Sequence, residues 1–377
     1  MERRNVYLDH NATTPLHPRV RDEIVSCLEL FGNPASIHAE GRAAEEKVTA
    51  ARRSVAGILG ARDGEIVFTS GGSESNATVF STFAHAAGQI AVLSIEHPSV
   101  LEPARALKAA GTPVRFLRVD GAGRLELSDL EEALRVPTAL VSVMAANNEI
   151  GTVQDIGEAA RMAHGAGALF HTDAVQAAGK IPLDVEGLGV DYLALSAHKI
   201  HGPKGVGALF VREGAPLAPL IRGGHQEEGR RAGTLNAPGI SAFGVACRCA
   251  REEMGETAAR LAALKEVLWT GILRAAPDAV RGGERAACLP GTLQVALPGV
   301  EGEALVLLLD LEGIRASTGS ACASGLDEPS ATLAAIGLSR TLARSSVRFS
   351  LGRDTRREDI EYVLSRLPAA LKRLTGK

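Results

Sequence analysis

One lysine stands out in the sequence because two apolar runs enclose it. Lys199 lies in the segment Ser196–Gly205, between the apolar runs 192–195 and 207–211. Lysine is seldom buried without a function, and a desolvated lysine loses its proton more readily and can form a Schiff base with an aldehyde. The alternative is a surface lysine in a Gly/Pro turn, which is the better interpretation for a lysine considered alone. The neighbouring polar residues therefore decide between the two.

Polar residues follow several predicted strands, and their types suit one shared site. They are Ser73, His97, Asn148, Asp173, Gln176, Ser196 and His198. In open parallel α/β sheets, ligands bind outside the carboxyl ends of the strands. We therefore expect these side chains and Lys199 to meet at one edge of one sheet.

Three of these features match the parts that a pyridoxal-type cofactor requires. The turn Ser70–Ser73 at a strand-to-helix junction offers backbone N–H groups for a phosphate, although most such turns are only tight turns. Asp173 is either a helix N-cap or a carboxylate that keeps a heterocyclic nitrogen protonated. His97 either ends a strand or acts as a general acid/base or ring-stacking group. Together they favour a Schiff-base role for Lys199.

Two residues near the C-terminus are further candidates. Cys322 lies in the small-residue loop Ser317–Gly325, and a thiol on such a loop is either reactive or an incidental surface cysteine. Arg348 is flanked by strand residues, so it is either a solvent-face residue or a bidentate clamp for a carboxylate. Cys247 and Cys249 have no second pair at zinc spacing, so we expect no metal site.

The elements that position these residues form an alternating pattern. Short apolar strands are predicted at 65–68, 90–95, 114–119, 139–144, 168–170 and 192–195, with helices between most of them. This alternation predicts an α/β fold with a mainly parallel sheet. A smaller α/β domain is predicted after residue 250. We expect a large domain of residues 15–250, and a small domain of residues 1–14 and 251–377 that carries the cysteine loop.

Length, composition and charge exclude several classes of protein. A chain of 377 residues suggests two or three domains, and a formal net charge of −3 gives no basic footprint for nucleic acid or an anionic membrane. The longest apolar run, 304–309, is far too short to span a bilayer. Five scattered cysteines imply no disulfide framework, so a cytoplasmic location is expected.

The ordered motifs of the chain together resemble a known family, the pyridoxal-phosphate-dependent cysteine desulfurases of the NifS/IscS type. The motifs are Tyr7-Leu8-Asp9, Asn11–Pro15, Gly32-Asn33-Pro34, Thr69–Asn76, Glu96-His97-Pro98, Asn147-Asn148-Glu149, His171–Gln176, Ser196–Lys199 with Gly202–Gly205, Arg231–Thr234, Gly319–Cys322 and Arg348–Gly352. The resemblance covers nearly the whole chain. It implies the aspartate aminotransferase-like fold, with a seven-stranded type of sheet in the large domain and a smaller α/β domain.

The resemblance also implies a role for each candidate residue. Cys322, Lys199 and His97 would be catalytic, and Arg348 with Asn33 would bind the substrate carboxylate. The residues that would bind pyridoxal 5'-phosphate are Lys199, Asp173, Gln176, Gly72, Ser73, Asn148, Ser196, His198 and, from the other subunit of a homodimer, Thr234.

The activity implied is removal of sulfur from L-cysteine, which gives L-alanine and a persulfide on Cys322. An iron–sulfur scaffold or another carrier protein would accept the sulfur. Ser73 stands where the family usually has threonine, and Glu228 where a basic residue is common. The sequence ends at Lys377, whereas longer members have a further C-terminal segment for the scaffold, so the acceptor stays open. The rivals are an aminotransferase or selenocysteine lyase of the same fold, or a sulfur-trafficking protein without catalysis.

Overall fold

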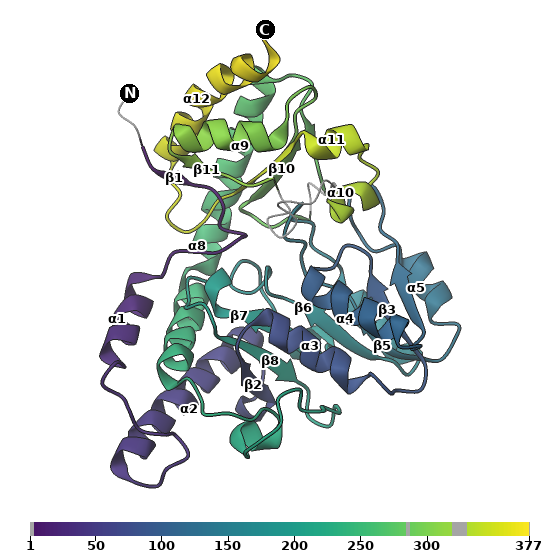
Figure 1. Ribbon diagram of the computed structural model, residues 1–377, viewed down its shortest axis with the longest axis vertical. Helices are drawn as coiled ribbons and strands as arrows, with labels where there is room; N and C mark the ends of the chain where they lie inside the picture. The colour runs from purple at the N-terminus through teal and green to yellow at the C-terminus, as the bar shows by residue number, and fades with distance from the viewer. Residues whose placement is uncertain (1–3, 284–286, 319–329, 377) are drawn as a thin grey trace.

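The structure, a computed structural model, describes residues 4–283, 287–318 and 330–376. Its main layer is a seven-stranded sheet with strand order β2-β8-β7-β6-β5-β3-β4 (Figure 1). The strands are β2 (Ile66–Thr69), β3 (Gln89–Leu93), β4 (Val114–Leu117), β5 (Thr138–Ser142), β6 (Leu169–Asp173), β7 (Tyr192–Ser196) and β8 (Gly207–Val211). The five strands from β4 to β7 run parallel, whereas β8 is antiparallel to both β7 and β2. The prediction of a mainly parallel sheet is confirmed.

Helices cover both faces of this sheet because its strands are apolar on both sides. Successive residues such as Ala91 and Val92 are buried in different apolar clusters, as the alternation of side chains along a strand requires. Helices α2, α6 and α8 pack on one face, and α3 and α4 on the other. The helices of this part are α1 (Pro18–Ser26), α2 (Ala39–Leu59), α3 (Gly72–Thr82), α4 (Pro98–Ala109), α5 (Leu127–Ala133), α6 (Ile156–Gly165), α7 (Val185–Leu188) and α8 (Ala237–Ala275).

A second, smaller group of elements lies at the C-terminal half of α8, which runs from the large sheet into it (Figure 1). Its antiparallel sheet has the order β12-β10-β9, and a parallel pair joins β1 to β11. The elements are β1 (Val6–Tyr7), β9 (Val280–Arg281), β10 (Thr292–Ala296), α9 (Gly302–Leu311), β11 (Ile314–Arg315), α10 (Ala331–Ala335), α11 (Arg340–Arg344), β12 (Ser346–Ser350) and α12 (Arg357–Thr375). Val6 and Leu8 share one apolar cluster with α8, α9 and α12. The exact division at residues 14 and 250 stays a prediction.

Helix α1 ends at Ser26. The Cys27 backbone N–H bonds to carbonyls of the preceding turn, and the apolar side chains of Leu28 and Phe31 are exposed. Across the described ranges, no helix combines the length and hydrophobicity that a bilayer span requires.

Candidate active site

A cavity of about 330 Å³ lies beyond the carboxyl ends of the parallel strands. It brings together ten of the predicted site residues: Gly72, Ser73, His97, Asn148, Asp173, Gln176, Ser196, His198, Lys199 and Arg348. Three others are not among its lining residues. Asn33 lines a separate pocket beside Arg52 and Glu227, Thr234 is exposed, and Cys322 lies outside the described residues.

Lys199 is held by the backbone of the N-terminal segment. It ends a single 3-10 turn, η2 (Ala197–Lys199), that follows β7 directly. Its Nζ donates to the carbonyl oxygens of Asn11 at 2.6 Å and Ala12 at 2.7 Å. The side chain is half-buried and lines the cavity. The amine is therefore both oriented and within reach of a bound ligand.

Asp173 and Glu96 form a pair of buried acids with different surroundings. The Asp173 carboxylate accepts hydrogen bonds from Asn76 Nδ2 at 2.8 Å and from the Val175 backbone N–H at 2.9 Å. Neither carboxyl oxygen of Glu96 has a hydrogen-bond partner among the described residues. Burial and the nearby Asp173 raise the pKa of Glu96 well above its usual range. The two carboxyl groups therefore differ: Asp173 accepts two hydrogen bonds, whereas burial favours the protonated form of Glu96.

His97 caps the start of α4 while lining the cavity. Its Nδ1 lies 2.7 Å from Ser99 Oγ and accepts the Ser99 backbone N–H at 3.1 Å. Burial lowers the pKa of His97, Asp173 raises it by a smaller amount, and Lys199 lowers it again. Because Nδ1 is engaged, proton exchange with a ligand falls to Nε2.

The start of α3 suits an anion. No side chain caps this 11-residue helix at Gly71, so its first N–H groups are available to a ligand. A Cβ on Gly72 would lie 2.6 Å from Val175 Cγ2, and one on Gly207 would lie 2.6 Å from Gly71 Cα. Glycine at both positions therefore lets this turn approach the strands closely.

Hydroxyl and imidazole groups complete this end of the cavity. Ser73, Ser196 and His198 all line it, so the hydroxyl at position 73 is available although the family usually has threonine there. His198 Nδ1 lies 3.0 Å from Thr13 Oγ1. Burial together with the neighbouring lysines Lys199, Lys204 and Lys180 lowers the pKa of His198 to about 4, so its imidazole is neutral at pH 7.

Arg348 reaches the cavity from β12. Its side chain is 2% exposed, and its Nη2 donates to Asp9 Oδ1 at 2.7 Å while Nη1 donates to the Asn148 carbonyl at 3.1 Å. A guanidinium carries five N–H donors. It can therefore bind a substrate carboxylate while part of it stays paired with Asp9.

The segment that contains Cys322 begins and ends beside this cavity. Before it, the Ser317 backbone forms an antiparallel bridge with Arg348. After it, Ser330 Oγ donates to Glu149 Oε2 at 2.6 Å. Arg348 and Glu149 both line the cavity.

Sequence reasoning gave no role to Asn11, which is the hub of the site. Besides Lys199, its carbonyl accepts Gln176 Nε2 at 2.9 Å. Its Nδ2 donates to the Asn148 carbonyl at 3.0 Å and to Thr292 Oγ1 at 2.9 Å, and its N–H donates to Ser350 Oγ at 3.0 Å. Asn11 thereby links the large sheet to β10 and β12. Its place in a motif was the one signal that could have found it.

Comparison with known proteins agrees with this geometry. The family model described as aminotransferase class-V matches residues 6–363. The chain belongs to this family. Among class-V aminotransferase relatives, the chain is 44% identical to cysteine desulfurase IscS of Dictyoglomus turgidum, over 99% of this chain and 96% of that protein. It is 45% identical to cysteine desulfurase NifS of Azotobacter vinelandii, over 98% and 93% of the two chains. The resemblance seen in the motifs is confirmed.

Two solved structures with similar folds agree with the family assignment. A NifS-like protein superposes with a TM-score of 0.92 at 38% identity, covering 98% of this chain and all of the other. SspA in complex with cysteine superposes with a TM-score of 0.81 at 34% identity, covering 92% and 98%. The aspartate aminotransferase-like fold expected from the motifs agrees with these members of the class-V aminotransferase family.

Proposed function

We propose that the protein is a cysteine desulfurase that binds pyridoxal 5'-phosphate in the 330 Å³ cavity and passes sulfur through Cys322. The observation that carries the proposal is the presence of Lys199, the hydrogen-bonded carboxyl group of Asp173 and the uncapped start of α3 around one cavity. These are the amine, the pyridine-nitrogen partner and the phosphate site that the cofactor needs. Glycine at positions 72 and 207 supports the phosphate site indirectly, because a Cβ at either position would collide with protein atoms and displace the turn that opens α3.

The remaining cofactor contacts follow from the cavity wall. Ser73, Ser196 and His198 would hold the phosphate, and Gln176 and Asn148 the ring substituents. Thr234, which is exposed in one chain, would join the phosphate from the second subunit of a homodimer. When bound, pyridoxal phosphate supplies an electron sink that weakens the bonds at the substrate's α- and β-carbons.

The chain's own residues supply the binding and the proton transfers. Arg348 would bind the carboxylate of L-cysteine. Lys199 Nζ would take up and return the proton of the α-carbon, while the Asn11 and Ala12 carbonyls keep the amine in place. His97 Nε2 would exchange the proton of the leaving group. Asn33 lies outside the cavity within one chain, so the carboxylate clamp proposed here is Arg348 without Asn33.

Cys322 would carry out the sulfur transfer. Its thiolate attacks the substrate sulfur, the carbon–sulfur bond breaks, and the carbon skeleton takes up a proton and leaves as L-alanine. The sulfur stays on Cys322 as a persulfide. The contacts of Ser317 with Arg348 and of Ser330 with Glu149 support this role, because these described residues on either side of the cysteine segment contact residues that line the cavity.

The partners and the compartment belong to the same proposal. We infer a homodimer in the cytoplasm, with residues 15–250 as the large domain and residues 1–14 with 251–377 as the small domain. An iron–sulfur scaffold would accept the sulfur. Titration of the persulfide form with a purified scaffold protein would test that step.

The test of the activity is incubation with labelled L-cysteine, followed by mass spectrometry of the protein and its products. We expect alanine in solution and one added sulfur on the peptide that contains Cys322. The matched control is Cys322→Ala, which should keep the cofactor's absorbance and form no persulfide. Unchanged sulfide release in that variant would refute the proposed mechanism and favour a lyase or aminotransferase of the same fold.

A further inference from the structure

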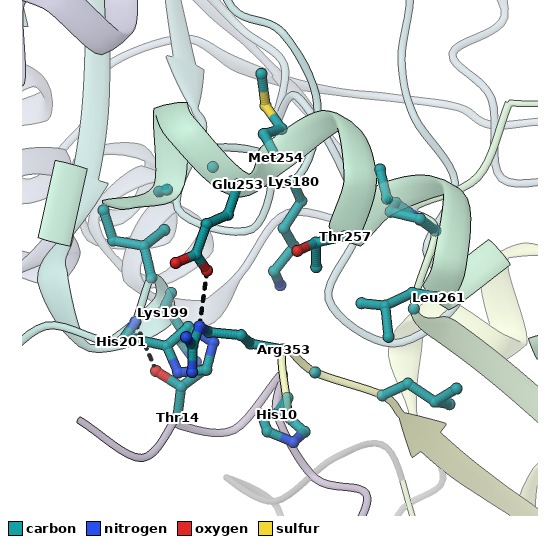
Figure 2. Close-up of a pocket in the computed structure, with 18 of the residues that line it drawn as sticks. His10, Thr14, Lys180, Lys199, His201, Glu253, Met254, Thr257, Leu261 and Arg353 are labelled. Atoms are coloured by element: carbon teal, nitrogen blue, oxygen red, sulfur yellow. Dashed lines mark hydrogen bonds and ion pairs between the residues drawn. The ribbon is translucent and has the colours of Figure 1, made fainter. Parts of the chain in front are cut away.

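A second lysine lies behind Lys199, in a smaller cavity of about 70 Å³ (Figure 2). This cavity is lined by Lys180 and Lys199, by His10 and His201, and by Glu253 of α8 with Arg353. Figure 2 shows the Lys180 side chain extending into it, separate from the Glu253–Arg353 ion pair. The proposed function leaves Lys180 without a role.

Lys180 is bound by two side-chain amides of the active site. Its Nζ donates to Gln176 Oε1 at 2.8 Å and to Asn11 Oδ1 at 3.2 Å. Gln176 Nε2 donates in turn to the Asn11 carbonyl, the same oxygen that accepts from Lys199. The two lysines are therefore joined through one residue.

This arrangement fixes the direction of the Gln176 amide. In its charged form Lys180 has three donors and no acceptor, and this form holds the Gln176 oxygen toward Lys180 and its nitrogen away. One N–H of that nitrogen goes to the Asn11 carbonyl, and an amide nitrogen carries a second. Since Gln176 also lines the larger cavity, it presents an N–H donor there and not an acceptor.

Lys180 also adds positive charge next to the site. Burial, Lys199 and Arg348 lower the pKa of Lys180 to about 7. Lys180 in turn lowers the pKa of three histidines that face it, namely His10, His198 and His201. Its hydrogen-bond acceptors among the described residues are both amide oxygens, so no carboxylate there neutralises its charge through a hydrogen bond. The charge is largest below pH 7, or when Lys199 is itself uncharged.

We propose that Lys180 is a positioning residue that makes Gln176 a hydrogen-bond donor toward an anionic oxygen of the bound ligand. The inference rests on the proposed function, in which that ligand is pyridoxal phosphate and the oxygen is the one on its ring. A donor and a nearby positive charge both stabilise the deprotonated, anionic form of such an oxygen. Both effects lower the pH at which the bound cofactor changes its protonation state.

The test is a pH titration of the cofactor's absorbance in the holoenzyme. Lys180→Met keeps the length of the side chain but removes its charge and its donor. We expect its absorbance midpoint to rise by about one pH unit or more, the size of effect that follows from losing a hydrogen bond to a charged group. Lys180→Arg keeps the charge and a donor, so its midpoint should stay near that of the wild type.

A second variant removes the acceptor of the Lys180–Gln176 hydrogen bond. Gln176→Leu removes the amide and should raise the midpoint in the same direction, which decides the matter if Lys180→Met does not yield holoenzyme. Midpoints that match the wild type in these variants would overturn the inference. Failure of the wild type to bind the cofactor at Lys199, seen as no borohydride-trapped adduct on that peptide, would refute the proposed function instead.

Discussion

Glu227 offers a sharp test of how the turn that carries the anion site is held. Its carboxylate has no exposed surface and accepts both terminal nitrogens of Arg52, at 2.6 and 3.0 Å. It also accepts the backbone N–H of Phe68 at 2.8 Å, just before the turn that opens α3. Glu227→Ala would remove the carboxylate that pairs with Arg52, whose Nη1 keeps its hydrogen bond to the Ile66 carbonyl, and would leave the Phe68 N–H without that acceptor. Removing one partner of a buried ion pair destabilises a protein by about 3–5 kcal/mol.

The neighbouring Glu228 provides a matched control. Both residues lie in the 3-10 turn η3 (Gln226–Gly229) with left-handed backbone, at φ 48° and φ 58°, so alanine meets the same backbone strain at either position. The Glu228 side chain, however, is 80% exposed and pairs with Arg230 only at the surface. Such exposed pairs contribute at most about 1 kcal/mol. The difference between the two variants therefore isolates the buried ion pair.

The assay is urea unfolding of the wild type and both variants, followed by circular dichroism. The midpoint and slope give the free energy of unfolding. We expect Glu227→Ala to lose about 2 kcal/mol or more beyond Glu228→Ala, and Glu227→Gln, which keeps an acceptor, to fall between them. Equal losses in the two alanine variants would show that the turn depends on its backbone conformation and not on the Arg52 contact.

Three further predictions concern the cavity and its acids and bases. Gly207→Ala should weaken cofactor binding about tenfold or more, because the new Cβ would lie 2.6 Å from Gly71 Cα. Gly64→Ala is the control and should leave cofactor binding unchanged, because no atom lies within 4 Å of its new Cβ. Equilibrium dialysis of the two variants measures the difference in binding. Glu96→Gln should be more stable than the wild type, and increasingly so as pH rises. A carboxyl with a raised folded pKa takes up a proton on folding, which costs about 1.4 kcal/mol per pH unit above its unfolded pKa. Parallel stability curves for the two proteins between about pH 5 and 8 would contradict this reasoning. Burial lowers the pKa of His171 to about 3, so the free energy of unfolding of the wild type should fall as pH drops below about 6.5. In His171→Gln the free energy of unfolding should depend less on pH in this acid range, which unfolding measurements at several pH values would show.

The sequence predicted much of the site because of a simple topological rule. Parallel strands put their carboxyl ends at one edge of a sheet, so Asp173, Ser196 and His97 were expected together on local grounds. The mainly parallel sheet and the presence of a smaller group of helices and strands after residue 250 followed from apolar patterning, whereas the antiparallel pairing of β12, β10 and β9 did not. The exact ends of helices, such as Ser26, depend on what the last turn can bury, and a single sequence does not contain that information.

Long-range contacts explain what could not be predicted. Asn11 bonds to Thr292, 281 positions away in the sequence, and Arg348 pairs with Asp9 across 339 positions. Nothing local marks such partners. The role of Lys180 could not be predicted for the same reason, since it depends on hydrogen bonds to Asn11 and Gln176 that form only in the folded protein. The substrate-binding role of Asn33 stays a prediction, because a motif in the sequence does not say which pocket its side chain will line.

The hydrogen bonds that hold Lys199 determine how point mutations at neighbouring positions affect the site. Both acceptors are peptide carbonyls, of Asn11 and Ala12, and every amino acid supplies that oxygen. A missense change at Ala12 therefore cannot delete the acceptor; it can only shift it by altering the path of the backbone. In a library of all single substitutions, small residues at position 12 that keep this backbone path should preserve activity, whereas every substitution at position 199 should abolish it. The reactive amine is in this sense shielded from point mutation at the residue that holds it.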